Sequence, residues 1–158
     1  MDLPKGYRLR AVRESDLDIV CAHRELMFSD EGKRTRDSLE KMTAYFRPWL
    51  QERLGDGRYF GFIIEREGEA VAGIGQWIID WAPHFHHEEE AHRGYIANVY
   101  VDPNHRGKGL AKFLVSCAEQ EFKARGVSTM VLHASRAGER LYEALGWDQT
   151  SEMMKIID

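Results

Sequence analysis

Residues 106–112, RGKGLAK, bring two glycines and several cations to a point where an apolar run gives way to a helical pattern. The first turn of a helix leaves backbone N–H groups without partners, and the helix dipole makes that end positive. Gly107 and Gly109 have no side chain to keep a phosphate from the backbone, while Arg106 and Lys108 add positive charge. The segment is therefore predicted to hold a phosphate or pyrophosphate, with a plain glycine turn as the alternative.

Two well-known phosphate-binding loops do not match this segment. A Walker A loop requires GxxxxGK followed by Ser or Thr, and that pattern is absent from the sequence. A dinucleotide-binding loop requires a third glycine where Lys112 stands, and the acidic residue that would hold a ribose about 20 positions later is missing. The sequence thus supports neither a nucleotide hydrolase nor a Rossmann oxidoreductase.

A second polar segment, residues 83–92 (PHFHHEEEAH), carries four histidines and three glutamates. Imidazole and carboxylate groups are suitable ligands for zinc or nickel. However, neighbouring side chains of an extended loop point in different directions, and no HExxH spacing is present. We therefore expect no metal at this segment.

The elements that must position these residues follow from the periodicity of the apolar residues. Helices are predicted over about 15–28, over 38–54 with a disturbance at Pro48, from Leu110 to a stop at Gly126, and over 137–146. Strands are predicted at 7–13, 59–66, 69–79, 94–101, 127–134 and 147–157. The order β-α-α-β-β-β-α-β-α-β predicts an α/β chain with a mixed sheet, of the α+β type, in a single domain over 1–158.

Composition and charge narrow the classes of function. The chain has 158 residues, 43% of them hydrophobic and 30% charged, with a formal net charge of −4. This acidic balance argues against nucleic-acid binding as the main role, and no apolar run is long enough to span a membrane. Cys21 and Cys117 fall in helical segments and are expected to be unpaired thiols, which together with the absence of a signal sequence predicts a cytoplasmic protein.

Two spaced motifs resemble those of the GNAT superfamily of acyl-CoA-dependent N-acyltransferases. The stretch VDPNHRGKGLA (101–111) is similar to motif A of that family, with Arg106, Gly109 and Ala111 at its defining positions. The stretch LYEALGW (141–147) is similar to motif B, and the predicted order of elements matches the GNAT fold along nearly the whole chain. The resemblance implies an N-acetyltransferase that uses acetyl-CoA as its acyl donor.

The resemblance also implies which residues contact coenzyme A. Backbone amides of Arg106, Gly107, Lys108, Gly109, Leu110 and Ala111 would hold its pyrophosphate. The strand that ends at Val99, Tyr100 and Val101 would pair with the pantetheine arm. In the family this strand diverges from the one at 127–134, and a bulge turns a backbone amide toward the thioester, where it would stabilise the oxyanion.

Tyr142 and Ser135 are the remaining candidates on the donor side. In the family, a tyrosine at the position of Tyr142 often protonates the departing thiolate, and an ordinary tyrosine keeps its proton at neutral pH. Packing against Leu141 and Leu145 is the alternative. Ser135 stands where many members carry an asparagine that contacts the cofactor; it either makes that contact or caps the following helix, and the two roles are compatible.

The acceptor side is less defined by the sequence. Some members place a glutamate on the cofactor strand as general base, but here that strand offers only Asn98, which could orient a substrate or a water but cannot take a proton. Asp30 and His84 are further candidates for contact with the substrate, the latter because its loop precedes the cofactor strand. Glu25, Asp80 and Glu88 also remain candidates for the base.

The predicted reaction is direct attack of a primary amine, on a small molecule or a protein, in a ternary complex. Cys21 and Cys117 lie at core-like positions, which argues against a covalent relay through cysteine. A catalytically idle acyl-CoA sensor or partner-binding module is the alternative, and the resemblance is compatible with a homodimer. The sequence does not identify the acceptor.

Overall fold

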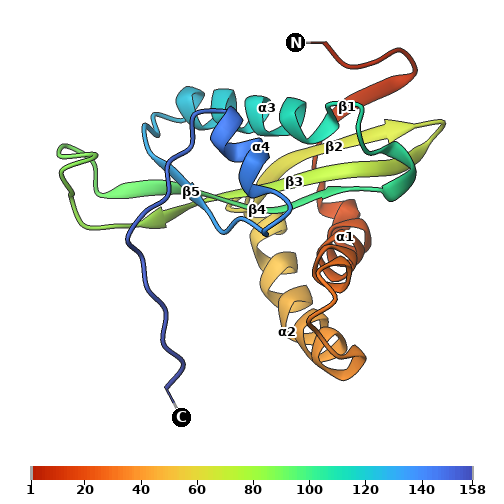
Figure 1. Cartoon of the computed structure of the whole chain (residues 1–158), viewed down its shortest axis with the longest axis horizontal. Helices are drawn as coiled ribbons and strands as arrows, with labels where there is room; N and C mark the ends of the chain where they lie inside the picture. The colour runs from red at the N-terminus through yellow and green to blue at the C-terminus, as the bar shows by residue number, and fades with distance from the viewer. Residues whose placement is uncertain (1, 158) are drawn as a thin grey trace.

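The computed structural model describes residues 2–157 and contains one five-stranded sheet with helices on both faces (Figure 1). The first four strands are antiparallel neighbours and the fifth runs parallel to the fourth, which confirms the predicted mixed sheet. The strands lie in chain order: β1 (Tyr7–Ala11), β2 (Phe60–Arg66), β3 (Glu69–Asp80), β4 (His92–Val101) and β5 (Met130–Leu132). The helices are α1 (Leu17–Asp30), α2 (Arg36–Gly55), α3 (Leu110–Ala124) and α4 (Glu139–Ala144).

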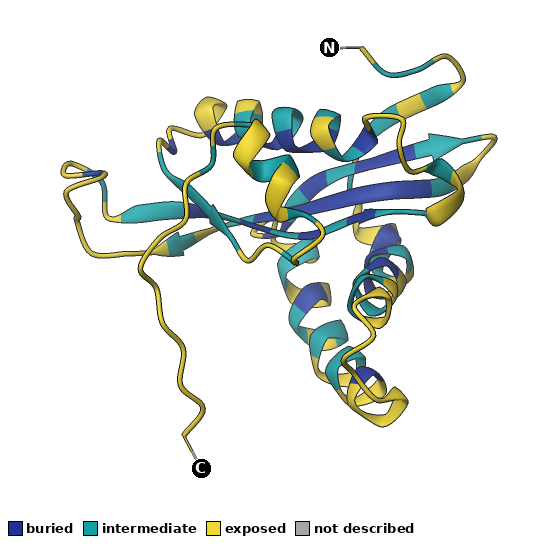
Figure 2. Cartoon of the chain, viewed as in Figure 1, coloured by how far each residue is buried: buried dark blue, intermediate teal, exposed yellow. Residues whose placement is uncertain are grey.

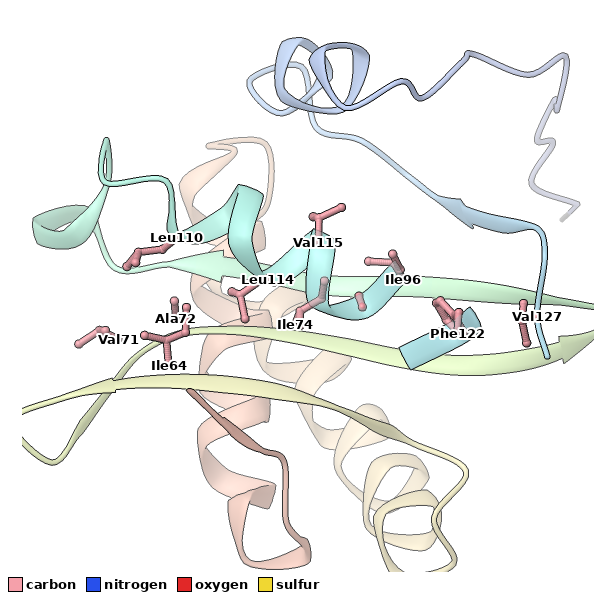
Figure 3. Close-up of a cluster of buried hydrophobic side chains, with 11 residues drawn as sticks. Ile64, Val71, Ala72, Ile74, Ile96, Leu110, Leu114, Val115, Phe122 and Val127 are labelled. Carbon is pink, nitrogen blue, oxygen red and sulfur yellow. The ribbon is translucent and has the colours of Figure 1, made fainter. Parts of the chain in front are cut away.

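The sheet separates two layers of helices. Helices α1 and α2 cover one face, and α3 and α4 lie on the other (Figure 1). Helix α3 turns an apolar stripe toward the sheet, and Leu110, Leu114 and Phe122 are almost completely buried in the main core beside Ile74 and Ile96 (Figure 3). This packing fixes the first residue of α3, and therefore the RGKGLAK segment, against the end of β4.

A bulge in β4 changes which face its side chains occupy. Gly75 of β3 pairs with Ala97 and Gly73 pairs with Tyr100, so two residues of β4 stand opposite one residue of β3. Asn98, one of these two residues, has a φ of 56°, in the left-handed region. Since successive side chains of a strand alternate between faces, the extra residue shifts the alternation beyond it.

The contacts of β4 follow this shift. Before the bulge, Ile96 packs in the core beneath α3, whereas Tyr95 stacks on Trp77 of the α1–α2 face with a centroid separation of 4.8 Å. Beyond the bulge, Val99 and Val101 pack against the α3 core, and Tyr100 lies 4.7 Å from the ring of His23 on α1. The bulge therefore places the side chains of both Asn98 and Tyr100 on the α1–α2 face.

Strands β4 and β5 pair over only three residues. Gly94, Tyr95 and Ile96 oppose Met130, Val131 and Leu132, and the ladder stops there. Within the described part of the chain, no strand pairs with the next five residues of β4, which include the bulge, on that side. The strands thus diverge at the bulge, as the family resemblance implies.

Two details of the sequence prediction are wrong. Residues 147–157, expected as a closing strand, form neither helix nor strand, and those from 148 on are exposed (Figure 2); Met153 retains 94% and Ile157 88% of their accessible surface. Their apolar residues favour a strand, but strand formation requires a partner, and the segment pairs with no described strand. Helix α2 also continues through Pro48 without a break, because the proline lies on its exposed side and costs one backbone hydrogen bond.

Candidate active site

The RGKGLAK segment forms a concentration of free backbone donors. Within residues 2–157, no oxygen accepts a hydrogen bond from the N–H groups of residues 107–112; the first such bond of α3 runs from the N–H of Phe113 to the carbonyl of Gly109. Gly107 and Gly109 have φ values of 75° and 77°, and no atom lies within 4 Å of where a Cβ would stand on either. Glycine is favoured here because other residues rarely adopt such φ values. We call residues 106–112 the amide cradle.

Two of the three charged side chains of the cradle, those of Arg106 and Lys108, are engaged within the protein. The guanidinium of Arg106 forms an ion pair with Asp30 at the end of α1, and its Nε donates to the carbonyl of Val101 at 3.0 Å. Lys108 donates from Nζ to the carbonyl of Asn104 at 3.2 Å. Asp30, expected near the substrate, is thus tied to the cradle through Arg106. The cradle offers an anion mainly its backbone amides.

Asn98 occupies the bulge, and its side chain points into the α1–α2 layer with 3% of its surface exposed. Its Oδ1 accepts from Nη1 of Arg24 on α1 at 2.7 Å, and its Nδ2 donates to the hydroxyl of Tyr59 at 2.9 Å. Both functional ends of the amide are therefore satisfied within the protein. The backbone of Asn98 and the following residues borders the gap where β4 leaves β5.

Tyr142 lies on α4, packed against the edge of the main core and against Trp147, at a centroid separation of 5.8 Å. Burial raises the pKa of Tyr142 to about 12, because the phenolate form would lose its hydration. The hydroxyl therefore keeps its proton at neutral pH. Packing and proton donation, the two alternatives from the sequence, both fit this position.

Ser135 precedes α4 and caps the turn that leads into it. Its Oγ accepts from the N–H of Gly138 at 3.2 Å, and its carbonyl accepts from the N–H of Gly138 and Glu139 at 2.8 Å and 3.1 Å. The capping role predicted for Ser135 is therefore present. By holding the start of α4, Ser135 also helps to position Tyr142 three residues into that helix.

His84 is not brought to this site. Its loop joins β3 to β4 and projects beyond the sheet at the opposite end of β4 from the cradle (Figure 1). His84 stacks on Phe85 and forms a single bridge with His87 in the same loop. Among residues 2–157, no group of three or more His, Cys, Asp or Glu side chains is arranged to hold a metal.

An open cavity of about 450 Å³ is also separate from the cradle, at the C-terminal end of α3 between Glu119 and Met130.

Several residues of this region were not predicted from the sequence. Tyr59, the residue just before β2, is buried beneath the bulge. Strand β3 leaves room for it because Gly75 has no side chain; a Cβ there would stand 1.8 Å from the hydroxyl oxygen of Tyr59. Burial raises the pKa of Tyr59 above its ordinary range. Arg24 completes the group and lies between the rings of Phe28 and Phe46, at 5.0 Å and 4.5 Å from their centroids. These residues come from separate elements, so no local motif marks them.

The model of the Acetyltransferase (GNAT) family matches residues 23–147. The chain belongs to this family. The match includes the part of α1 from residue 23 on, the cradle, the bulge and motif B, which confirms the family and the acyltransferase class predicted from the two motifs. Both cysteines are free, as expected.

Similar proteins and structures agree with this assignment. A GCN5-related N-acetyltransferase from Ralstonia eutropha JMP134 has 45% identity and a TM-score of 0.93, over 96% of this chain and 99% of that one. A predicted acetyltransferase from Clostridium acetobutylicum, solved with acetyl-CoA, has 25% identity and a TM-score of 0.83, over 96% of both chains. A mycothiol acetyltransferase from Thermobispora bispora is 31% identical over 92% of this chain. The chain spans about half of that relative, 48% of its length.

None of the described helices is both long and apolar enough to cross a bilayer.

Proposed function

We propose that the chain transfers an acetyl group from acetyl-CoA to a primary amine by direct attack in a ternary complex. The observation that carries the proposal is the amide cradle, with six consecutive N–H groups free to bind a pyrophosphate beside the gap between β4 and β5. The Clostridium acetobutylicum relative, whose structure contains acetyl-CoA, supports this choice of donor.

Acetyl-CoA supplies the thioester, and the residues of the chain bind and polarise it. Amides of Gly107 to Ala111 hold the pyrophosphate, and the open side of β4 at Val99 to Val101 pairs with the pantetheine arm. The N–H of Arg106 is not free for this role, because it donates to the carbonyl of Pro103 at 3.4 Å. Backbone N–H groups beside the bulge stabilise the negative charge that develops on the carbonyl oxygen. A contact between Ser135 and this arm is compatible with its role as a cap.

The proton balance of the reaction assigns a role to Tyr142. The amine nitrogen forms a bond to the acyl carbon, the carbon–sulfur bond breaks, and the sulfur leaves with its electron pair. Tyr142 gives its proton to that sulfur, while the attacking nitrogen releases one proton to water and Tyr142 takes one back from water, so that no net proton is gained or lost. Its raised pKa keeps the donor form populated throughout the neutral range.

The decisive experiment is release of coenzyme A thiol from acetyl-CoA in the presence of an amine panel. The panel contains polyamines, free amino acids, aminophosphates, aminoglycosides and peptides with free N-termini. Thiol release that depends on one class of amine, with an equimolar amount of acetylated product, is expected. Tight binding of coenzyme A without turnover on any of these classes would instead favour an acyl-CoA sensor.

A further inference from the structure

The guanidinium of Arg24 is a positive charge with an incomplete set of partners. Within residues 2–157, its only hydrogen bond goes to Oδ1 of Asn98, and its Nε is buried with no acceptor. The titratable groups that favour its charged form are Tyr59, Tyr95 and Cys21, none of which is a carboxylate. A guanidinium removed from water without a counter-ion is unfavourable, so an anion brought by a ligand would be strongly attracted to it.

The aromatic rings around Arg24 hold the guanidinium in place. Phe28 of α1 and Phe46 of α2 face it on their ring planes, which stabilises the cation but supplies no formal negative charge. The carboxylates on the same two helices have other partners. Glu25 accepts from Thr43 and pairs with Arg36, and Asp18 pairs with Arg47. The charge of Arg24 is thus left uncompensated by its own layer.

The position of Arg24 connects this charge to the proposed reaction. Its partner Asn98 is the bulged residue of β4, and the residue after it begins the segment proposed to face the thioester. Adjacent Cα atoms are 3.80 Å apart, so one hydrogen bond and the short side chain of Asn98 separate the guanidinium from the backbone proposed to face the thioester. An acceptor that places its amine at the bulge and an anion at Arg24 is therefore a small molecule.

We propose that Arg24 is a specificity-determining residue that binds the anionic group, a carboxylate or a phosphate, of a small amine acceptor. The proposal rests on the proposed function, since it names the acceptor class of the same site. The planar guanidinium is suited to both oxyanions because its N–H groups form a fixed fork. Asn98 orients this fork through its hydrogen bond to Nη1.

Two matched pairs of probes test the proposal. O-Phosphoethanolamine is compared with ethanolamine, and L-phenylalanine with L-phenylalaninamide, so each pair differs in its anionic group. Binding is measured by calorimetry with the enzyme saturated in coenzyme A, and acetyl transfer is measured as kcat/KM. Calorimetry needs no turnover, so anion-dependent binding without thiol release would contradict the proposed function while supporting the role of Arg24.

Two variants alter the charge in different ways, and a third serves as control. Arg24→Gln removes the cation. Asn98→Asp keeps the size of the side chain at the bulge and supplies Arg24 with an internal counter-ion, and aspartate also tolerates a positive φ. Arg47→Gln removes a cation from the neighbouring helix, where it pairs with Asp18 on the surface.

In the wild type and in Arg47→Gln, the anionic member of at least one pair is expected to bind at least about 10-fold more tightly than its neutral partner. In Arg24→Gln and Asn98→Asp this ratio is expected to fall to near 1. A purely structural role for Arg24 would weaken both members of a pair equally and leave the ratio unchanged. The proposal is overturned if the wild type favours neither anion, or if the preference survives in Arg24→Gln. The pair that shows the preference identifies the anion as phosphate or carboxylate.

Discussion

The amide cradle and the surroundings of Arg24 are two proposed anion-binding regions built in opposite ways. The cradle is exposed, uses backbone N–H groups of consecutive residues, and depends on glycines with positive φ. The Arg24 region lies in the α1–α2 layer and uses one side chain, held by Asn98 and by rings from two helices. A backbone site recognises a group common to a whole class of cofactors, whereas a side-chain site can differ between related proteins.

The largest expected effect is on the cradle. Gly109→Val should weaken coenzyme A binding about 30-fold, because a side chain at a φ of 77° costs roughly 2 kcal/mol and drives the loop away from its binding conformation. Lys108→Ala should change the dissociation constant less than about 3-fold, since an exposed charge contributes little. Calorimetric titration with coenzyme A measures both.

Gly6→Val is the matched control for this comparison. Gly6 also has a positive φ, 89°, with open space around it, but it precedes β1 and lies outside the cradle. Its substitution should leave coenzyme A affinity unchanged. If Lys108→Ala proved more damaging than Gly109→Val, the cradle would act through side-chain charge and the contrast with Arg24 would disappear.

Substitution of Tyr142 tests whether a side chain beside the acetyl donor also takes part in the reaction as a proton donor. Tyr142→Phe should reduce kcat by about 10-fold or more, because the thiolate loses its proton donor, while the affinity for coenzyme A stays within about 2-fold. The ring of Tyr142 packs in the core, and phenylalanine preserves that packing. Steady-state kinetics and a coenzyme A titration on the same preparation separate the two effects. Unchanged turnover would remove Tyr142 from the mechanism.

The pH dependence of kcat should show a smaller effect, whose direction follows from the raised pKa of Tyr142. Burial raises the pKa of Tyr142 to about 12, so its proton is lost only as the pH rises through that value. The ratio of wild-type kcat to that of Tyr142→Phe should therefore stay constant from pH 7 to about pH 10.5. A tyrosine with an ordinary pKa near 10 would lose most of this advantage by pH 10.5. A decline centred near pH 10 would contradict a buried donor.

The smallest expected effect is at the histidine-rich loop. His84→Ala should leave kcat/KM for the best acceptor within about 2-fold of the wild type, because the loop lies at the end of β4 away from both anion-binding regions. The amine panel measures this directly. A loss of 10-fold or more would restore the expectation, drawn from the sequence, that His84 contacts the substrate.

The contrast between the two regions also explains what could be predicted from the sequence. The cradle, the strand before it and motif B were found because each depends on residues that are close together in the chain. The sequence indicates Asn98 as a candidate but not its partners Arg24 and Tyr59. Arg24 on α1 and Tyr59 before β2 come close to Asn98 on β4 only in the folded protein. Asn98 faces Arg24 and Tyr59 because of one bulge in β4, and no pattern of residues in the sequence specifies the position of that bulge.

The closing strand illustrates a different limit of the sequence. Residues 148–157 carry apolar residues that favour a strand, yet Met153 and Ile157 are exposed. Local propensity indicates which conformation suits a segment, but the presence of a partner strand decides whether it forms. Helix α2 shows the converse, since a proline expected to disturb the helix is accommodated on its surface.

The sheet separates the α1–α2 layer from α3 and its cradle, and this has an evolutionary consequence. Substitutions at distant sites without shared partners change free energies almost independently. Substitutions on α1 and α2 can therefore change which acceptor the enzyme binds while the amide cradle stays unchanged. The bulge in β4 borders both the Arg24 region, through Asn98, and the gap proposed for the cofactor, so it is where such independence should end.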